Sequence, residues 1–344
     1  MNVIDLFCGC GGLSLGFQQA GCNVLLGIDN NEAALETFKN NHDNSSVLKG
    51  DITQIGKKEI KKIIGNKRID IIVGGPPCQG MSLSGPRKFD DPRNSLYRSF
   101  IRIVEEIRPK AFVIENVPGL VSLYGGQIKN AIIEQFNELG YQVEYQVLTA
   151  SDYGVPQQRK RVFFVGLQGK AFVFPEPCKT KVTCEMALSD LPPLSDSIGL
   201  KIGKYHKNCQ NEYQKEMRGR SSEVHNHIAA NHSERTKEII SLVPNGGNYK
   251  DLPDAYRNTR NFHVAWTRFD RNGPAPTIDT GHRHHFHYEY NRVPTVRECA
   301  RLQSFPDDFI FLGNKTDQFR QVGNAVPPLL AKEIASALIR QMEE

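Results

Sequence analysis

The first half of the chain alternates between short apolar runs and longer segments whose apolar residues recur every three or four positions. The short runs are rich in β-branched residues and are bounded by glycine or polar residues, so they predict strands, whereas the longer segments predict helices. The predicted strands are 2–7, 23–28, 47–48, 69–73, 111–114, 141–148 and 162–167, and the predicted helices are 13–20, 32–41, 95–107 and 127–139. This alternation indicates an α/β fold with a doubly wound, mostly parallel sheet.

The pattern changes after about residue 175. Strand and helix no longer alternate, and proline, histidine, asparagine and arginine become frequent, above all in the polar stretch 205–292. A stretch of that length is too long for a linker inside a compact domain, so it predicts a second, smaller domain. Residues 329–342 have the spacing of a plain amphipathic helix. We therefore expect one domain from residues 1–175 plus 315–344, and a smaller one from residues 176–314.

Composition narrows the class of protein without deciding it. The 344 residues carry a formal net charge of +5, which permits a polyanionic partner but does not require one. The eight cysteines contain no C-x-x-C pair, so neither a zinc ribbon nor a thioredoxin-type motif is indicated, and a reducing compartment is expected. No apolar run approaches the ~18 residues of a membrane span, and no export signal precedes the first strand. The expected location is the cytoplasm.

The stretch 74–84 is the strongest candidate for chemistry. A strand that ends at two glycines runs into Pro76, Pro77 and Cys78. The prolines stiffen the backbone and cannot continue a sheet ladder, which is a poor setting for a structural cysteine. It suits a thiolate directed from a sheet edge into a cleft, although an ordinary loop cysteine is the simpler alternative.

Several polar or aromatic residues fall at or just after the predicted strand ends. In a parallel doubly wound sheet, ligands bind beyond the carboxyl ends of the strands. A carboxyl group such as that of Glu115, beside an apolar strand, can act as a proton donor, or can simply be a helix N-cap. The residues that share this position are Phe7, Asp29, Asp51, Cys78 and Glu115.

The turn after the first strand contains Gly9, Gly11 and Gly12. This spacing matches neither the Gly-x-Gly-x-x-Gly pattern of dinucleotide sites nor the Walker loop. Asp29 ends the second strand, where an acidic side chain can hold a ribose diol. The pattern favours a nucleoside cofactor without a pyrophosphate, against the alternative of an ordinary tight turn.

Two charged clusters remain open to several interpretations. The basic turn 157–161 contains Arg159 and Arg161 and suits phosphate or base contacts, or is simply a solvated turn. Four histidines follow later in the chain, but no acidic or cysteine pair near them has metal spacing, so no metal site is predicted. These histidines are expected to be exposed, or to face phosphates or base edges together with Arg283. They are His282, His284, His285 and His287.

Taken together, the motifs resemble those of the DNA (cytosine-5) methyltransferase family. Residues 5–17 resemble the cofactor motif, 74–84 the Pro-Cys motif, and 115–117 the Glu-Asn-Val motif. Residues 157–161 resemble the Gln-x-Arg-x-Arg motif, and 297–301 and 321–327 resemble the last two motifs. The resemblance covers nearly the whole chain except its variable middle. It implies a Rossmann-like methyltransferase sheet and a length similar to that of bacterial modification enzymes.

The resemblance implies S-adenosylmethionine as cofactor and S-adenosylhomocysteine as product, without a metal. Phe7 would stack on the adenine, Asp29 would bind the ribose hydroxyls, and Asp51 would bind the adenine amino group. Leu96 would pack against the adenine, and Asn324 would face the amino-acid end. The full expected set is Phe7, Cys8, Gly9, Gly11, Gly12, Asp29, Asn30, Asp51, Ile52, Pro76, Leu96, Asn324 and Ala325.

The resemblance also implies a catalytic route. Cys78 would add to carbon 6 of a cytosine that has been rotated out of the duplex, so that carbon 5 becomes nucleophilic. Glu115 would bind ring nitrogen 3 and the exocyclic amine, and Arg161 would hold the carbonyl oxygen of the base. Arg159 is counted with these catalytic residues. The loop 80–93 is expected to close over the base as a lid.

The expected partners are double-stranded DNA and a cognate restriction endonuclease, with the enzyme acting as a monomer in the cytoplasm, at the nucleoid of a prokaryote. A tRNA cytosine-5 methyltransferase, a catalytically silent DNA-binding repressor and a nucleotide-dependent oxidoreductase are the alternatives. The long middle segment, the presence of Cys78 and Glu115, and the glycine spacing disfavour them in turn. Expected DNA contacts are Ser82, Ser84, Arg93, Arg257, Arg260, Arg268, Arg271 and Arg283.

Overall fold

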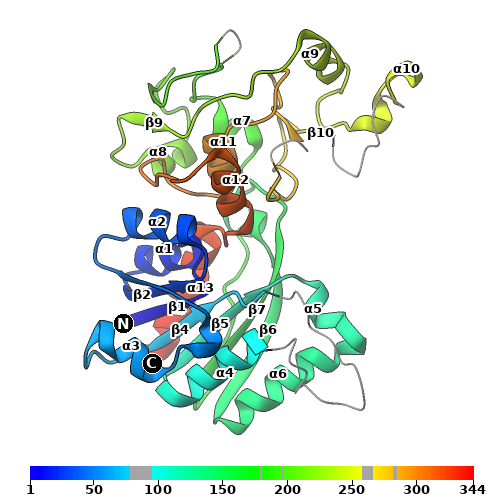
Figure 1. Ribbon diagram of the computed structural model, residues 1–344. Helices are drawn as coiled ribbons and strands as arrows, with labels where there is room; N and C mark the ends of the chain where they lie inside the picture. Colours follow the sequence, from blue (N-terminus) through cyan, green and yellow to red (C-terminus); the bar gives the residue numbers. More distant parts are fainter. Residues whose placement is uncertain (78–94, 179, 195–196, 258–265, 282–284) are drawn as a thin grey trace. The chain divides into compact units, whose positions relative to one another are not determined.

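The computed structural model describes residues 1–77, 95–178, 180–194, 197–257, 266–281 and 285–344 (Figure 1). The chain forms two compact units. The first unit comprises Met1–Thr149, Lys160–Pro177 and Pro328–Glu344, and the second comprises Ala150–Arg159 and Cys178–Pro327. The roles expected for the two predicted domains remain predictions.

A seven-stranded sheet organises the first unit. The strand order is β3-β2-β1-β4-β5-β7-β6, in which the first five strands are parallel and β7 runs antiparallel to both of its neighbours. This confirms the predicted doubly wound, mostly parallel α/β fold. The strands are β1 (Asn2–Leu6), β2 (Asn23–Asp29), β3 (Ser46–Lys49), β4 (Ile71–Gly74), β5 (Ala111–Asn116), β6 (Tyr141–Thr149) and β7 (Lys160–Gln168).

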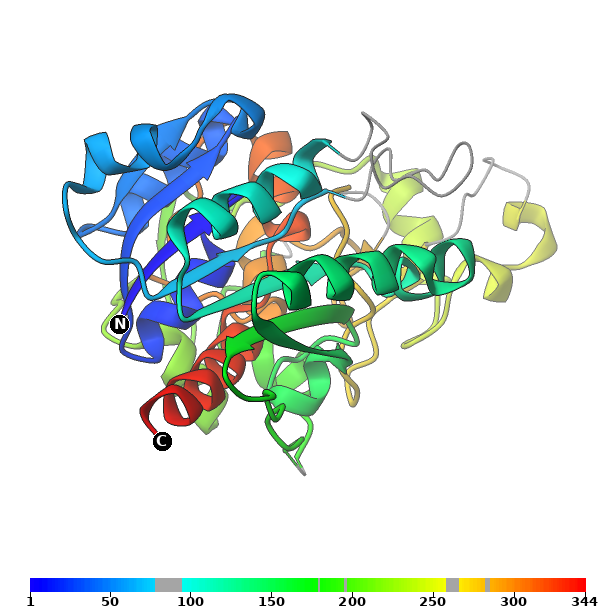
Figure 2. The same cartoon turned by 90° about the horizontal axis from the view of Figure 1, so that it is seen from below.

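Helices cover both faces of the sheet. On one face lie α1 (Gly12–Gln19), α2 (Glu32–Asn41) and α13 (Pro328–Glu343). On the other lie α3 (Lys57–Ile64), α4 (Ser95–Ile107) and α6 (Gln127–Glu138), of which α4 and α6 run side by side (Figure 2). The sequence pattern did not predict α3, because only Ile60 and Ile64 of this lysine-rich helix are buried. Short segments complete the unit: η1 (Ile52–Gln54), α5 (Gly119–Ser122) and η3 (Leu123–Gly126).

The face covered by α3, α4 and α6 holds an apolar core. Phe112 of β5 stacks on Phe136 of α6 with ring centroids 3.9 Å apart, and Phe100 of α4 meets both rings edge-on. All three rings are fully buried. Gly166 of β7 is required there, because a Cβ at that position would lie 2.0 Å from the Phe112 ring. Burial of aromatic and aliphatic side chains therefore accounts for this part of the fold.

The opposite face is completed by a helix from the far end of the sequence. Helix α13 packs against α1, as Figures 1 and 2 both show. Their backbones approach closely at Gly16, where a Cβ would lie 2.3 Å from the Ala331 Cβ and 2.6 Å from the Pro328 carbonyl oxygen. Glycine at this position permits the docking.

The second unit consists of short elements joined by irregular chain. Its two small sheets pair β8 (Ile202–Lys204) with β9 (Glu223–His225), and β10 (Thr267–Arg268) with β11 (His285–Phe286). The longest helices are α9 (Glu234–Ser241) and α12 (Lys315–Asn324). The other helical segments are η4 (Ala150–Tyr153), α7 (Cys184–Leu188), α8 (Glu212–Arg218), η5 (Tyr249–Asp251), α10 (Asp254–Arg257) and α11 (Val296–Leu302).

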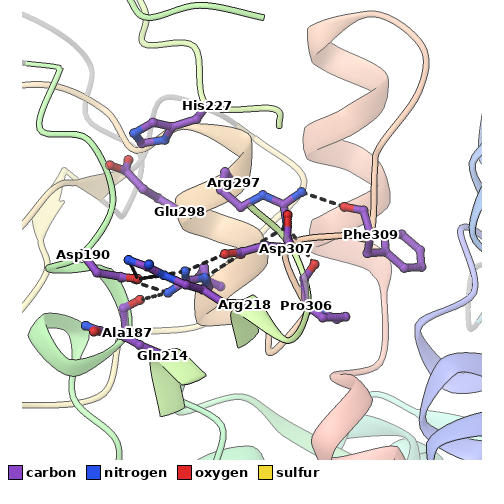
Figure 3. Close-up of polar contacts among 12 residues, drawn as sticks. Ala187, Asp190, Gln214, Arg218, His227, Arg297, Glu298, Pro306, Asp307 and Phe309 are labelled. Carbon is purple, nitrogen blue, oxygen red and sulfur yellow. Dashed lines mark hydrogen bonds and ion pairs between the residues drawn. The ribbon is translucent and has the colours of Figure 1, made fainter. Parts of the chain in front are cut away.

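Buried ion pairs organise the second unit around α11. Arg301 is fully buried and binds two carboxylates, those of Asp190 at 3.1 Å and Asp307 at 2.6 Å. Figure 3 shows Asp190, Arg218, Asp307 and Arg297 gathered beside this helix. The Arg297 guanidinium donates to the Phe309 carbonyl at 2.7 Å. Charges buried this deeply persist only when they are paired and hydrogen-bonded, as these are.

Among the described residues, no helix is both long enough and apolar enough to cross a membrane.

Candidate active site

The turn after β1 has the backbone shape of a ligand cradle. Phe7 has φ +67° and is half-buried, Gly9 has φ +53°, and Gly11 has φ +99°. A Cβ at Gly9 would meet no atom within 4 Å, so open space lies beside the backbone there. The Cys8 N–H donates to the Ile28 carbonyl at 3.0 Å, and this bond ties the turn to β2. Such a turn allows a ligand to approach the main chain closely.

Asp29 ends β2 and braces this turn. Its Oδ2 accepts the Gly9 N–H at 2.8 Å, and its Oδ1 accepts the Asn31 N–H at 2.8 Å. Asp29 is half-buried, while the adjacent Asn30 is exposed. Each carboxylate oxygen keeps a second lone pair for a hydroxyl donor. The expected position of Asp29 at the strand end is thus what the structure has.

Three more of the expected cofactor residues belong to the first unit and follow β3 or lie on α4. They are Asp51, Ile52 and Leu96. Asp51 is exposed, and its Oδ1 accepts the Thr53 N–H at 2.9 Å, which lowers the pKa of this carboxyl. Ile52 is buried, and half-buried Leu96 packs against the apolar core from α4. An ionised carboxylate can accept hydrogen bonds from one edge of a flat ring, while the apolar side chains beside it cover the faces of that ring.

Asp5 lies on β1, two residues before Phe7, and is not among the residues that the sequence predicted for the site. It is 1% exposed, and its Oδ2 accepts the Ser14 hydroxyl at 2.7 Å. Its Oδ1 is buried and has no hydrogen-bond partner among the described residues. Burial is the main reason that the pKa of the Asp5 carboxyl is raised to about 7; the Ser14 hydrogen bond opposes this shift, and the nearby Asp29 carboxylate adds to it. The carboxyl group therefore titrates near neutral pH.

The two thiols of the turn are not suited to nucleophilic attack. Burial raises the pKa of Cys10 to about 12 and raises that of Cys8 well above its ordinary value. Because the thiolate is the reactive form, neither residue supplies it at neutral pH. Cys78, the expected nucleophile, lies outside the described residues.

The end of β5 brings Glu115 and Arg161 together. The Arg161 Nε lies 2.8 Å from Glu115 Oε1, and both side chains are mostly buried. Glu115 is directly opposite Phe163 in the antiparallel β5–β7 pair, so Arg161, two residues earlier on β7, is its diagonal neighbour on the same face. Gly75 lies against this carboxylate, since a Cβ there would be 3.0 Å from Glu115 Oε2. An ion pair beside a glycine-proline turn is a suitable place to hold a polar ring edge.

Asn116 connects β5 to that turn, and its position in the Glu-Asn-Val motif predicted no role for its side chain. Its Nδ2 donates to the Pro76 carbonyl at 2.9 Å, and its Oδ1 accepts the Val117 N–H at 2.8 Å. Pro76 and Asn116 are both buried. The bond fixes the chain two residues before Cys78. In the sequence, the only indication of this bracing role is the amide side chain that directly follows the Glu115 carboxylate.

The remaining expected site residues belong to the second unit or lie outside the described residues. Asn324 ends α12 and is exposed, and Ala325 is half-buried. Arg159 is 1% exposed and donates to the carbonyls of Ile278 and Gly323. With Cys78, the expected DNA contacts Ser82, Ser84, Arg93, Arg260 and Arg283, the lid 80–93, and the histidines His282 and His284 lie outside the described residues.

The described DNA-contact candidates differ in exposure. Arg268 is buried and donates to the carbonyls of Val243, Ile240 and His287, while Arg271 is half-buried and pairs with Glu185 at 2.6 Å. Arg257 is the last residue of α10. The Arg271 side chain can therefore contact a polyanion. The N–H donors of Arg268 are already engaged by carbonyl groups of the second unit.

The expectation that the histidine cluster is exposed or faces DNA is wrong for His287. Its side chain is 2% exposed, and its Nδ1 accepts the N–H groups of Glu289 and Tyr290. Burial lowers the pKa of His287 to about 3, so the ring is neutral. Among the described residues, no group of three or more His, Cys, Asp or Glu side chains has the arrangement of a metal site.

The chain is similar over almost its whole length to known proteins. The family model described as C-5 cytosine-specific DNA methylase matches residues 1–340. Type II methyltransferase M1.HphI of Haemophilus parahaemolyticus is 41% identical over 344 residues, which cover 99% of this chain and 87% of that protein. Type II methyltransferase M.DdeI of Desulfomicrobium norvegicum is 39% identical over 368 residues, covering 98% and 88% respectively.

Solved structures give the same picture. A crystal structure described as a DNA modification methyltransferase encoded within a prophage of E. coli is 32% identical, with a TM-score of 0.84 and full coverage of both chains. The S. pombe Dnmt2 methyltransferase is 16% identical with a TM-score of 0.62, again over both whole chains. The second likeness concerns the fold alone.

Proposed function

Because the chain belongs to the C-5 cytosine-specific DNA methylase family and is a DNA (cytosine-5) methyltransferase of the Type II restriction-modification kind, we propose the following reaction. The enzyme uses S-adenosylmethionine to methylate a cytosine that has been rotated out of the duplex. The reaction proceeds through a covalent adduct between Cys78 and this cytosine. The observation that carries the proposal is the buried Glu115–Arg161 pair beside the turn 75–77 that leads into Cys78.

The described residues fit the cofactor. The open space beside Gly9 lies next to Phe7 and Asp29, and Asp51 follows the neighbouring strand β3. Aromatic and acidic side chains suit the base and ribose of a nucleoside, and carboxyl groups suit a cationic sulfonium amino acid. By the family resemblance, Asn324 faces the amino-acid end, and Ala325 belongs to the expected cofactor-binding set. The cofactor supplies an electrophilic methyl group.

The chain's own residues prepare the cytosine. The Cys78 thiolate adds to carbon 6, and the ring electrons move to carbon 5, which becomes nucleophilic. Glu115 hydrogen-bonds to nitrogen 3 and the exocyclic amine, while Arg161 hydrogen-bonds to the carbonyl oxygen, so that both stabilise the adduct's charge. After methylation, loss of the carbon 5 proton returns an electron pair to the ring and expels the Cys78 thiolate. The target atom is inaccessible in stacked DNA, which requires base flipping.

The positioning of the nucleophile is carried by Asn116. Its bond to the Pro76 carbonyl and its bond to the Val117 N–H join the turn 75–77 to the strand that bears Glu115. A turn that is tied to the strand of Glu115 in this way needs less reorganisation at the moment of reaction.

The test uses DNA that contains 5-fluorocytosine at the target position. Fluorine cannot leave as a proton does, so the wild-type enzyme is expected to remain covalently attached to the DNA at Cys78. Cys78→Ser should form no such complex and lose methyl transfer, while retaining DNA and cofactor affinity, because a serine hydroxyl is a much poorer nucleophile.

Cys178→Ser, a change at an exposed cysteine, is the matched control and should trap normally. Active wild-type enzyme that gives no covalent complex would overturn the adduct mechanism. Labelled cofactor offered with duplex DNA or tRNA separates the DNA enzyme from the tRNA alternative.

The biological role that follows is protection of host DNA from a cognate restriction endonuclease, with the enzyme acting as a monomer on its site. The names of the Type II relatives support this role. Mapping 5-methylcytosine in DNA from cells that express the enzyme would identify the site, and digestion of that DNA with the candidate endonuclease would test protection.

A further inference from the structure

The C-terminal turn of α12 is held by side chains from distant parts of the sequence. The last carbonyls of a helix lack intrahelical partners, and glycine-based caps or water commonly satisfy them. Here the Arg159 Nη2 donates to the Gly323 carbonyl at 2.9 Å. The Gln303 Nε2 donates to the Ala325 carbonyl at 2.6 Å and to the Val322 carbonyl at 3.3 Å. The carbonyls of Val322, Gly323 and Ala325, on both sides of Asn324, are therefore fixed.

The groups that hold this turn are connected to one another. Arg159 Nη1 donates to the Ile278 carbonyl at 3.1 Å, and the Ile278 N–H donates to Gln157 Oε1 at 2.9 Å. Gln157 in turn donates to Gln303 Oε1 and to the Leu302 carbonyl. Arg159, Gln157 and Gln303 are at most 1% exposed. The three side chains form one buried brace inside the second unit, which we call the α12 brace.

The backbone next to the brace has no freedom to shift. A Cβ at Gly323 would lie 2.2 Å from the Asp279 carbonyl oxygen and 2.6 Å from the Thr280 nitrogen. The segment 278–280, whose first residue accepts a hydrogen bond from Arg159, therefore presses directly on the turn. Asn324 is the exposed residue of this turn, while its neighbours Gly323 and Val322 are buried.

We propose that Arg159 is a positioning residue for the cofactor site: with Gln303, it holds the C-terminal turn of α12 so that Asn324 is presented in one orientation. This differs from the expectation that Arg159 acts beside Arg161 as a catalytic residue. The inference rests on the proposed role of Asn324 at the amino-acid end of S-adenosylmethionine. Arginine suits the position because its planar group donates to two carbonyls at once and its charge favours a helix C-terminus.

The test is a double-mutant cycle. Lysine at position 159 keeps the charge but cannot bridge both carbonyls, so Arg159→Lys should weaken S-adenosylmethionine binding about tenfold, the size expected for one lost hydrogen bond to a charged group. Asn324→Ala should weaken it by a similar factor. The double variant should bind no more weakly than Asn324→Ala alone, because the brace acts through Asn324. Affinity is measured by calorimetry without DNA.

Turnover separates the two arginines. At saturating cofactor, Arg159→Lys should regain nearly the wild-type rate, whereas Arg161→Lys should keep its cofactor affinity and lose rate. Gln303→Met removes the other half of the brace and is the second variant. It takes the place of Arg159→Lys in the test if Arg159→Lys does not fold, and the same changes in cofactor affinity and rate are expected of it. Melting temperatures are recorded for every variant.

Three outcomes would overturn the inference. The first is unchanged cofactor affinity in Arg159→Lys or, if that variant does not fold, in Gln303→Met, while Asn324→Ala is impaired. The second is an effect that multiplies in the double variant, and the third is a loss of DNA affinity with a flatter salt dependence. If Asn324→Ala binds the cofactor normally, the assigned role of Asn324 falls and this inference falls with it. The adduct mechanism would stand or fall separately, by the trapping of 5-fluorocytosine DNA.

Discussion

Two buried carboxyl groups, one in each unit, have pKa values that are shifted in opposite directions. Asp307 in the second unit is held by Arg301, whose attraction and hydrogen bonds keep the pKa of this carboxyl lowered against the opposing effect of burial. Asp5 in the first unit accepts a hydrogen bond from the Ser14 hydroxyl and has no ion pair to a cation among the described residues, and burial raises its pKa to about 7. Burial alone thus favours the protonated acid, and a paired guanidinium reverses that preference. The first unit is built mainly from apolar packing, whereas the second unit depends on paired charges.

The largest effect is expected from breaking the pairing in the second unit. Arg301→Met leaves the carboxylates of Asp190 and Asp307 buried without their shared cation, which costs about 3–5 kcal/mol of unfolding free energy. Urea unfolding measures it, with Arg340→Met on the exposed side of α13 as control. A change below about 1 kcal/mol in the single variant would contradict the role given to the pair.

A smaller effect with a distinct pH dependence is expected from Asp5. The unfolded carboxyl has an ordinary pKa of 3.8 and the folded one about 7, so the folded state binds more protons between these values. Stability should therefore fall as pH rises from about 4 to 7, by at most about 4 kcal/mol. Asp5→Asn removes this dependence, and should be more stable than the wild type at pH 8.

The measurement for Asp5 is the free energy of unfolding at several pH values between 4 and 8. Asp43→Asn changes an exposed carboxyl of the same unit and serves as the control. Parallel pH profiles for the wild type and Asp5→Asn would show that Asp5 is not the titrating group.

The smallest effect on stability is expected where a charge of the second unit faces solvent. Arg271→Ala should change the unfolding free energy by less than about 1 kcal/mol, since its ion pairs are exposed. If Arg271 reads a base, DNA discrimination should fall by ~1–3 kcal/mol at one position of the site. If it binds phosphate, affinity for all sequences should fall and the salt dependence should become flatter.

Arg268→Ala is the matched contrast to Arg271→Ala. Arg268 donates to buried carbonyls, so its removal should destabilise the protein before it affects recognition. Cofactor affinity should be unchanged in Arg271→Ala. An Arg271 variant with wild-type specificity and salt dependence would direct attention to Arg257 and to the candidates Arg260 and Arg283.

Apolar periodicity predicted the first unit well. The expected helix 95–107 coincides with α4, and most predicted strands agree with the observed ones within two residues at either end. The reason is that this sheet is stabilised by buried aliphatic and aromatic side chains, which leave a regular pattern in the sequence. The strand ends also indicated Asp29 and Glu115, because the rim of a parallel sheet is defined by topology.

The sequence was less informative where burial involves polar groups. Arg268 and His287 looked like surface groups for DNA, yet both are buried because backbone carbonyls and N–H groups of the second unit engage them. The two arginines of the turn 157–161 differ for the same reason: Arg161 pairs with Glu115, and Arg159 donates to carbonyls more than a hundred residues away. A polar residue's partners depend on tertiary contacts that no local pattern records.

The contact between α1 and α13 has a consequence for the newborn protein. Roughly 150 residues separate Pro177 from Pro328, so at ~5–20 residues per second the ribosome needs about 8–30 s to reach α13 after the rest of the first unit has been made. During that interval the surface of α1 around Gly16 has no covering helix. Chaperones that bind apolar surface would have time to act there. A transcript broken before codon 328 would yield a sheet with all seven strands but without α13 to cover α1.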